Sequence, residues 1–354
     1  MMQPYVLFRV IVLSVLLLMV GSATPIYVPI LIAVAGAFLL HPLVRFMTER
    51  SWWPSPNGAG KSAAILSALM IGAAVALLMI GVIIQPILTE IVHLSENIPS
   101  ILQSLQQVLL AVEKNVNENR LFGEELQSMI KDVLQGGMTI GLNFAKKAAS
   151  FSIELFSGVI DFIVIPVLIF FLLKDHQLLA DDILSLVDAK YRNKAREILT
   201  ETASAIGSYL QGQVIVCLLV GVMVFGGLLF FKIPYPFVLA CLAGITEAIP
   251  IIGPILAAIP AILLGLVVSP MTALKAAIFY LVVQQVENHI IVPKVMGGSI
   301  HLHPVVVIVG LLLAGELYGV GGMVLALPVI ATVRIFIKHF WWKEEGDEYE
   351  HKHG

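Results

Sequence analysis

The stretch Gln284-Gln285-Val286-Glu287-Asn288-His289 places five polar side chains in the middle of a hydrophobic run at 274–297. A second interruption, Glu247-Ala248-Ile249-Pro250, lies inside the preceding hydrophobic run at 237–268. A charged side chain at the centre of a bilayer costs about 2.5–3.5 kcal/mol on insertion scales, so such residues are kept where they face protein or water. The two stretches therefore predict a polar pathway inside a bundle of membrane helices.

The composition is that of a membrane protein. Hydrophobic residues make up 58% of the 354-residue chain, whereas soluble domains contain roughly 45–50% apolar residues. A soluble protein with a large buried core is the alternative, but runs such as 5–21 and 25–40 contain almost no polar residue that could face water. The sequence therefore predicts an all-α, polytopic membrane helical bundle.

Charge and motif content argue against other classes of protein. The net charge is −3, and no basic run with interleaved aromatic residues points to nucleic acid. The stretch 57–62 ends in Gly-Lys-Ser, but a phosphate-binding loop would need glycine where Ser55 stands. Metalloprotease and serine-hydrolase motifs do not occur, and Cys217 and Cys241 lie in apolar runs. We expect no enzymatic activity, no cofactor and no metal site.

Hydrophobic runs long enough to cross a bilayer recur along the chain. A crossing needs about 20 helical residues. The ordinary candidates lie at 5–22, 25–44, 62–87, 151–173 and 208–231. The first could be a signal peptide, but the second follows almost at once, so an uncleaved helical hairpin is favoured. Runs at 237–268, 274–297 and 302–340 complete about eight spans.

The first and last of these three runs are too long for one straight crossing. Prolines and glycines interrupt both runs, namely Pro250, Gly253, Pro254 and Pro260 in the first and Gly315, Gly319, Gly321, Gly322 and Pro328 in the last. Proline removes a backbone donor and clashes with the preceding turn, while glycine lets helices approach closely. We therefore expect broken or re-entrant helices in the C-terminal half, beside a cavity or within protein.

Basic residues near the span ends predict the orientation. Lysine and arginine cluster around Arg9 and at 45–61, 174–196 and 334–343, and such clusters favour the cytoplasmic side. Both termini are then cytoplasmic. The predicted organisation is three spans in 1–87, an extracytoplasmic amphipathic helical segment in 88–150, a membrane transport core in 151–343 with cytoplasmic helices at 174–205, and a disordered acidic tail in 344–354.

Glu287 is the strongest candidate for a functional residue. Helical spacing places Gln284, Glu287 and Asn288 on one face of a predicted helix. Hydrogen bonding between bundle helices is the alternative role for such residues. A carboxylate, an imidazole and three amides together favour a functional site, because intramembrane ionisable residues usually mark a pathway for ions or substrate.

Two further carboxylates lie beside predicted helix breaks. Glu247 precedes Pro250 and the Gly253-Pro254 pair by one to two turns, where freed backbone carbonyls would help to bind a cation or a proton. Glu316 lies among the glycines of the last run. It is either a similar site or an interfacial carboxylate in a loop between half-helices.

Taken together, these residues closely resemble the autoinducer-2 exporter family of permeases. The shared motifs are Glu247-Ala248-Ile249-Pro250-Ile251-Ile252-Gly253-Pro254, Gln285-Val286-Glu287-Asn288, Pro293-Lys294-Val295-Met296-Gly297, His303-Pro304 and the glycine-rich run to Leu327-Pro328. The resemblance spans nearly the whole chain. It implies a bacterial inner-membrane transporter of about eight spans that forms a homo-oligomer, with a pentamer as one candidate state. The functional core that it implies is Glu247, Pro250, Gly253, Pro254, Glu287, Asn288 and Pro293.

We therefore predict a secondary transporter that moves a small polar molecule or an ion, coupled to protons or sodium. Members of the family are associated with autoinducer-2 export, while others resemble sodium or lithium/proton antiporters, so both substrate classes stay open. A membrane scaffold that binds a partner through 88–150 and an oligomeric pore are the alternatives. The expected partners are membrane lipid, a small polar solute or monovalent cation, protons and further copies of the chain, with no nucleic acid.

Overall fold

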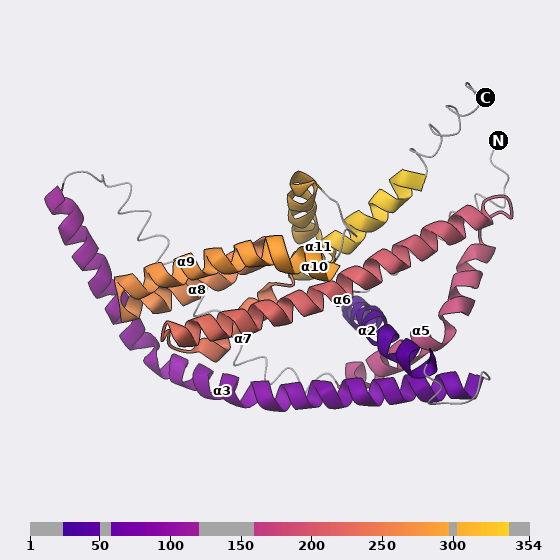
Figure 1. Cartoon of the computed structure of the whole chain (residues 1–354), viewed down its shortest axis with the longest axis horizontal. Coiled ribbons are helices and arrows are strands. Elements are labelled where there is room, and N and C mark those ends of the chain that lie inside the picture. The colour runs from indigo at the N-terminus through magenta and orange to yellow at the C-terminus, as the bar shows by residue number, and fades with distance from the viewer. Residues whose placement is uncertain (1–23, 50–57, 120–158, 297–302, 340–354) are drawn as a thin grey trace, which may run out of the picture. The chain divides into compact units, whose positions relative to one another are not determined.

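The computed structural model describes residues 24–49, 58–119, 159–296 and 303–339 (Figure 1). These residues are helical apart from short turns, and no strand occurs among them. The all-α prediction is confirmed. The expected first span at 5–22, the tail at 344–354 and the whole of 120–150 lie outside the described residues.

The first of two compact units contains three apolar helices, α2 Thr24–Glu49, the beginning of α3 Gly58–Asn119, and α5 Val159–Ser185. Ala33, Ile65 and Ile169, one from each helix, are buried together in its core. The Nζ atom of Lys61 donates a hydrogen bond of 2.9 Å to the carbonyl of Lys174. This bond ties the start of α3 to α5 near one end of the unit.

The second unit contains the rest of α3 and every described helix after α5. These helices are α6 Arg192–Phe230, α7 Pro236–Thr246, α8 Ile252–Val268, α9 Pro270–Val286, the π-helical turn η1 Glu287–Ile291, α10 Val292–Met296 and α11 Pro304–Ile337. Proline opens α7 and α9, at the helix position where its missing N–H group is unneeded. Ser269 caps α9 by accepting a hydrogen bond from the backbone N–H of Thr272 at 3.0 Å.

The hydrophobic run at 237–268 is broken into two half-helices, as its prolines and glycines predicted. α7 ends at Thr246, and a tight turn that includes Ile251 at φ 71° leads into α8. Gly253 lies so close to the end of α7 that a Cβ atom on it would be 2.0 Å from the carbonyl oxygen of Thr246. The absence of a side chain at Gly253 therefore allows the chain to reverse here.

The last hydrophobic run is also broken, at Gly319. This residue has φ 61° and ψ −148°, a backbone conformation that only glycine adopts without strain. The two halves of α11 then pack on each other, because Gly310 lies against Ile330 and Gly315 against Met323. The predicted breaks in the C-terminal half are confirmed for both long runs, while their re-entry into the membrane stays a prediction.

The part of α3 beyond residue 75 packs on the start of α7. The Glu90 carboxylate accepts hydrogen bonds from the backbone N–H groups of Phe237 at 3.3 Å and Val238 at 2.8 Å. Asn97 donates a hydrogen bond to the Tyr235 hydroxyl at 3.2 Å. Since α3 runs without a break from 58 to 119, a separate extracytoplasmic segment at 88–150 stays a prediction.

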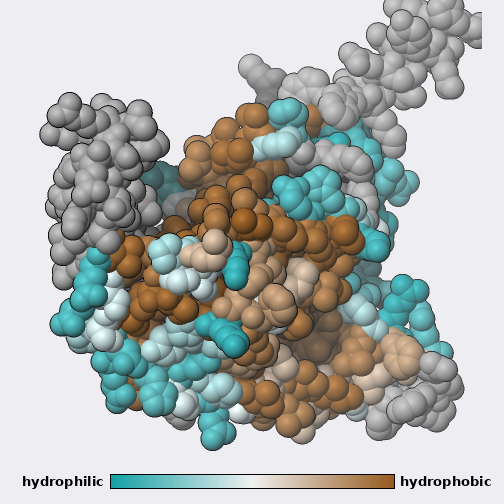
Figure 2. All heavy atoms as spheres, turned by 60° about the vertical axis from the view of Figure 1, so that its left-hand side comes forward, coloured by the Kyte–Doolittle hydropathy of each residue, from teal (hydrophilic) through white to brown (hydrophobic). Residues whose placement is uncertain are grey.

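The outer surface is apolar, as contact with lipid requires. Figure 2 shows hydrophobic residues over much of the face in view. Large side chains such as Met70, Val222 and Leu317 are more than two-thirds exposed. Within the described residues, five helices are long and apolar enough to cross a membrane, namely Pro29–Glu49, Gly60–Leu94, Ile163–Ser185, Arg192–Phe230 and Pro304–Ile337. A polytopic membrane bundle is confirmed, while the count of eight spans stays a prediction.

The close approach at Gly253 leads to a test of the turn. Substitution Gly253→Ala should destabilise the fold by about 1–3 kcal/mol, since the backbone carbonyl of Thr246 is in the way of the new methyl group. Gly226→Ala is the matched control, because no atom lies within 4 Å of its added Cβ. Thermal unfolding of the purified variants in detergent should show a lower Tm for Gly253→Ala alone. Equal Tm values would contradict the packing described for this turn.

Candidate functional site

Glu247 lies at the break between α7 and α8. It directly follows the last residue of α7, and its backbone N–H still donates a helical hydrogen bond of 3.0 Å to the carbonyl of Ala243. Its side chain is only 1% exposed. The end of the half-helix therefore places a carboxyl group inside the second unit rather than at its surface.

Glu287 lies at a second irregularity of the backbone. α9 ends at Val286, and η1 begins at Glu287 with the wider π-helical hydrogen-bonding pattern before α10 continues the helix. Single π-helical turns inside α-helices are frequent at functional sites. Glu287 is 7% exposed, and its neighbours one turn away, Val283 and Ile291, belong to the apolar core.

The two carboxyl groups meet. The carboxyl groups of Glu247 and Glu287 lie within hydrogen-bonding reach of each other, although they are 40 positions apart in the sequence. Such a bond needs a hydrogen on one of the two groups, because an ionised carboxylate is only an acceptor. A hydrogen bond between them would use one shared proton, in surroundings rich in alanine, valine and leucine.

Two amide side chains support the pair. Gln284 donates from Nε2 to Oε2 of Glu287 at 3.1 Å. Gln213 on α6 donates from Nε2 to the backbone carbonyl of Glu247 at 2.7 Å, and the same nitrogen lies 3.9 Å from Sγ of Cys217. Within the described chain, Oε2 of Glu247 has no hydrogen-bond partner. One carboxyl oxygen therefore remains available for a ligand.

Helix α6 packs closely on the elements that carry both carboxyl groups. A Cβ atom on Gly244 of α7 would lie 3.0 Å from the carbonyl oxygen of Cys217, and one on Gly212 would lie 2.9 Å from Cγ of Met296 in α10. Farther along α6, Gly227 lies against the ring of Phe279 in α9. Small residues on α6 and α7 thus let the helix backbones approach until the polar groups touch.

The structure brings together some of the residues singled out in the sequence. Gln284, Glu247 and Glu287 share one cluster, and Pro250, Gly253 and Pro254 form the turn and first residues of α8 that follow Glu247. The functional roles of the turn residues stay predictions. Their structural role is to return the chain beside the pair.

Other predicted residues lie apart from the pair. Asn288 and Pro293 are exposed on η1 and α10, and Glu316 is exposed on α11 close to the break at Gly319. Asn288 is exposed although the adjacent Glu287 is buried, so the two side chains do not share one environment. The roles of these three residues stay predictions.

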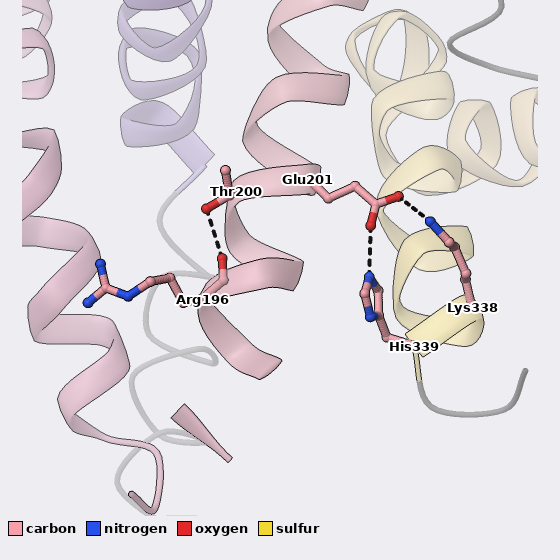
Figure 3. A network of polar contacts seen from close by, with 5 residues as sticks. All are labelled: Arg196, Thr200, Glu201, Lys338 and His339. Atoms are coloured by element: carbon pink, nitrogen blue, oxygen red, sulfur yellow. Dashed lines mark hydrogen bonds and ion pairs between the residues drawn. The ribbon is translucent and has the colours of Figure 1, made fainter. Parts of the chain in front are cut away.

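A second polar cluster lies where α11 ends against α6. Glu201 accepts a hydrogen bond of 2.8 Å from Nζ of Lys338 at Oε1, and its Oε2 lies 2.7 Å from Nε2 of His339 (Figure 3). His339 is 2% exposed, so its imidazole is almost enclosed. Neither this cluster nor Gln213 was singled out from the sequence, since only folding brings α11 and the turn after α7 to α6.

Comparison with known proteins gives a consistent classification. The family described as "AI-2E family transporter" matches residues 6–342. The chain is 28% identical over 317 residues to "Putative transport protein YrrI" of Bacillus subtilis (strain 168), covering 89% of this chain and 86% of that protein. It is 30% identical over 321 residues to "Putative transport protein YueF" of the same organism, covering 88% and 83%.

A further relative is named for a specific activity. The chain is 25% identical over 320 residues to the "Sodium-lithium/proton antiporter" of Halobacillus andaensis, covering 87% of this chain and 88% of that protein. The family and these relatives are transporters rather than enzymes. The match to the family covers nearly the whole length, and the chain therefore belongs to the AI-2E transporter family.

Proposed function

We propose that this chain is a secondary transporter that couples the movement of a small polar solute or ion to protons or sodium, with Glu247 and Glu287 as the coupling site. The observation that carries the proposal is the close approach of two buried carboxyl groups on different helices. Exchange of sodium or lithium for protons is the form to test first. It is supported by the similarity to a relative named as a sodium-lithium/proton antiporter.

Charge balance explains how the pair would couple two ions. With one proton shared, the two carboxyl groups carry a net charge of −1. If that proton leaves and a sodium or lithium ion takes its place, the net charge is again −1. In surroundings of low dielectric constant, states of equal net charge avoid the large cost of adding an uncompensated charge. A proton and a monovalent cation would therefore compete for this site.

The neighbouring groups supply suitable ligands for a monovalent cation. Oε2 of Glu247 has no partner within the described residues, and the side chains of Gln213 and Gln284 each hold an amide oxygen close to the pair. Hard oxygen ligands of this kind are those that alkali and other hard cations prefer.

The remaining parts of the proposal concern location, assembly and the exposed candidates. We place the protein in the bacterial inner membrane with both termini in the cytoplasm, and expect a homo-oligomer that native mass spectrometry would count. We assign Asn288, Pro293 and Glu316 to the solute pathway as further candidates, to be tested one at a time. Their exposure suits contact with a neighbouring subunit or with a solute.

The first test uses protein reconstituted in liposomes that contain a pH-sensitive dye. Addition of sodium or lithium should change the dye signal for the wild type, and Glu287→Gln or Glu247→Gln should reduce the response to that of empty liposomes, because an amide cannot release a proton. Glu49→Gln is the matched control, since Glu49 is exposed in the first unit. Full activity of Glu287→Gln would remove Glu287 from the mechanism.

The same preparation separates ion exchange from solute export. If neither cation changes the dye signal of the wild type, a panel of small polyhydroxylated compounds should be screened by thermal unfolding. A transporter of such a solute should gain Tm with rising ligand concentration, because the ligand binds the folded state. If no cation changes the dye signal and no compound of the panel raises Tm, the proposed transport would be contradicted.

The proton shared by the pair gives a chemical test. A hydrophobic carbodiimide adds to a protonated carboxylic acid in an apolar environment, so we expect it to modify Glu247 or Glu287 and to leave the exposed Glu49 and Glu96 unmodified. Peptide mass spectrometry would locate the adduct. Sodium or lithium should slow the reaction by displacing the proton, while choline should not. Modification that sodium leaves unchanged would contradict competition at this site.

A further inference from the structure

The buried face of α6 changes character along its length. Thr202, Tyr209 and Gln213 recur at spacings of seven and four residues, so they lie on one face of the helix. The same face continues beyond Gln213, and every residue there is apolar, in the series Val216, Val220, Val224 and Leu228. The polar part spans about 16 Å of helix, at about 1.5 Å per residue.

The polar part carries hydroxyl groups that the described protein does not satisfy. Tyr209 is 2% exposed, and neither its hydroxyl nor the buried Oγ1 of Thr202 has a hydrogen-bond partner in the described ranges. Buried polar atoms in proteins are normally hydrogen-bonded, either to protein or to ordered water. These two hydroxyls therefore indicate water along this part of α6.

Both ends of the polar part meet charged groups. At one end, Glu201 adjoins Thr202 in the chain and is more than one-third exposed in its contacts with Lys338 and His339 (Figure 3). At the other end, Gln213 donates its hydrogen bond to the carbonyl of Glu247. The sequence of groups thus runs from a solvent-accessible carboxylate to the buried carboxyl pair.

The opposite side of the pair is closed by apolar packing. Val220, Val224 and Leu228 are at most 3% exposed, and the Phe279 ring fills the space over Gly227. Tyr280 belongs to this apolar core, and its buried hydroxyl also has no partner within the described chain. Unlike Tyr209, which shares its face with Thr202 and Gln213, the Tyr280 hydroxyl lies among apolar side chains and offers too few polar partners to hold water. A Tyr side chain thus lies on each side of the pair, one on the polar part of the α6 face and one in the closed core.

From this arrangement we infer that the face of α6 from Thr202 to Gln213 holds a file of water through which the carboxyl pair exchanges protons with the solvent beside Glu201 and His339. The apolar face from Val216 to Leu228 closes the other side in this conformation. The inference rests on the proposed function, because it supplies the route by which the coupling site would reach one compartment.

X-ray footprinting tests the presence of this water directly. Brief synchrotron pulses produce hydroxyl radicals from water bound inside the protein, and mass spectrometry then measures oxidation residue by residue. In the wild-type protein, Tyr209 should oxidise several-fold faster than Tyr280, although both are more than nine-tenths buried. Tyr280 is the internal control, because it has the same side-chain chemistry.

A pair of variants tests the direction of the route. Thr202→Val removes one hydroxyl while keeping the shape of the side chain, so it should lower the oxidation of Tyr209 toward that of Tyr280. Thr200→Val is the matched control, since Thr200 is exposed and its hydroxyl bonds to the carbonyl of Arg196 within the same helix. Thermal unfolding of both variants checks that a changed oxidation rate does not reflect a damaged fold.

The outcomes separate this inference from the proposed function. Equal oxidation of Tyr209 and Tyr280 would overturn it, whether both are slow, which means no water, or both are fast, which means an opening on both sides. A folded Thr202→Val protein with wild-type oxidation of Tyr209 would also overturn the route from Glu201. Fast oxidation of Tyr209 in a protein that exchanges no cation would support the file of water and contradict the proposed exchange of cations for protons.

Discussion

The structure of the second unit depends on the high cost of an unpaired charge away from water. Two carboxyl groups lie within a core of small apolar side chains, and each would be unstable there alone. The hydrogen bonds from Gln284 to the Glu287 carboxyl group and from Gln213 to the Glu247 backbone, together with a proton shared by the pair, would let the two groups remain buried. This requirement fixes which faces of α6 and α9 meet and where α7 must end.

Irregular backbone and buried polarity occur at the same places. Glu247 stands where α7 stops, and Glu287 stands where the helix changes from α to π geometry. A regular helix satisfies its own backbone groups, so a break is where carbonyl and N–H groups become available to side chains and ions. The breaks at 247–251 and Glu287 thus supply the polar groups of the candidate site, while intact helices surround them with apolar side chains.

Local sequence could predict the class of protein, the broken helices and the two carboxylates, because charge and proline inside a hydrophobic run are visible without knowledge of tertiary contacts. The break at Gly319 could be narrowed to a cluster of glycines but not to one residue, since only the packing of the two halves of α11 selects it. Gln213 could not be singled out, because its hydrogen bond to the backbone carbonyl of Glu247 forms only when the turn after α7 packs on α6. The π-helical turn at Glu287 could not be predicted either, because regular helical spacing does not anticipate it.

The second half of α11 has a mechanical consequence. Ala326 packs with Ile249 in the turn beside Glu247, while Lys338 and His339 hold Glu201 on α6. The second half of α11 therefore contacts both the turn beside Glu247 and the polar cluster at Glu201. If the second half of α11 tilted about Gly319, its contacts with the turn beside Glu247 and with Glu201 would change in the same movement. A change at one of these two places would then be coupled to a change at the other.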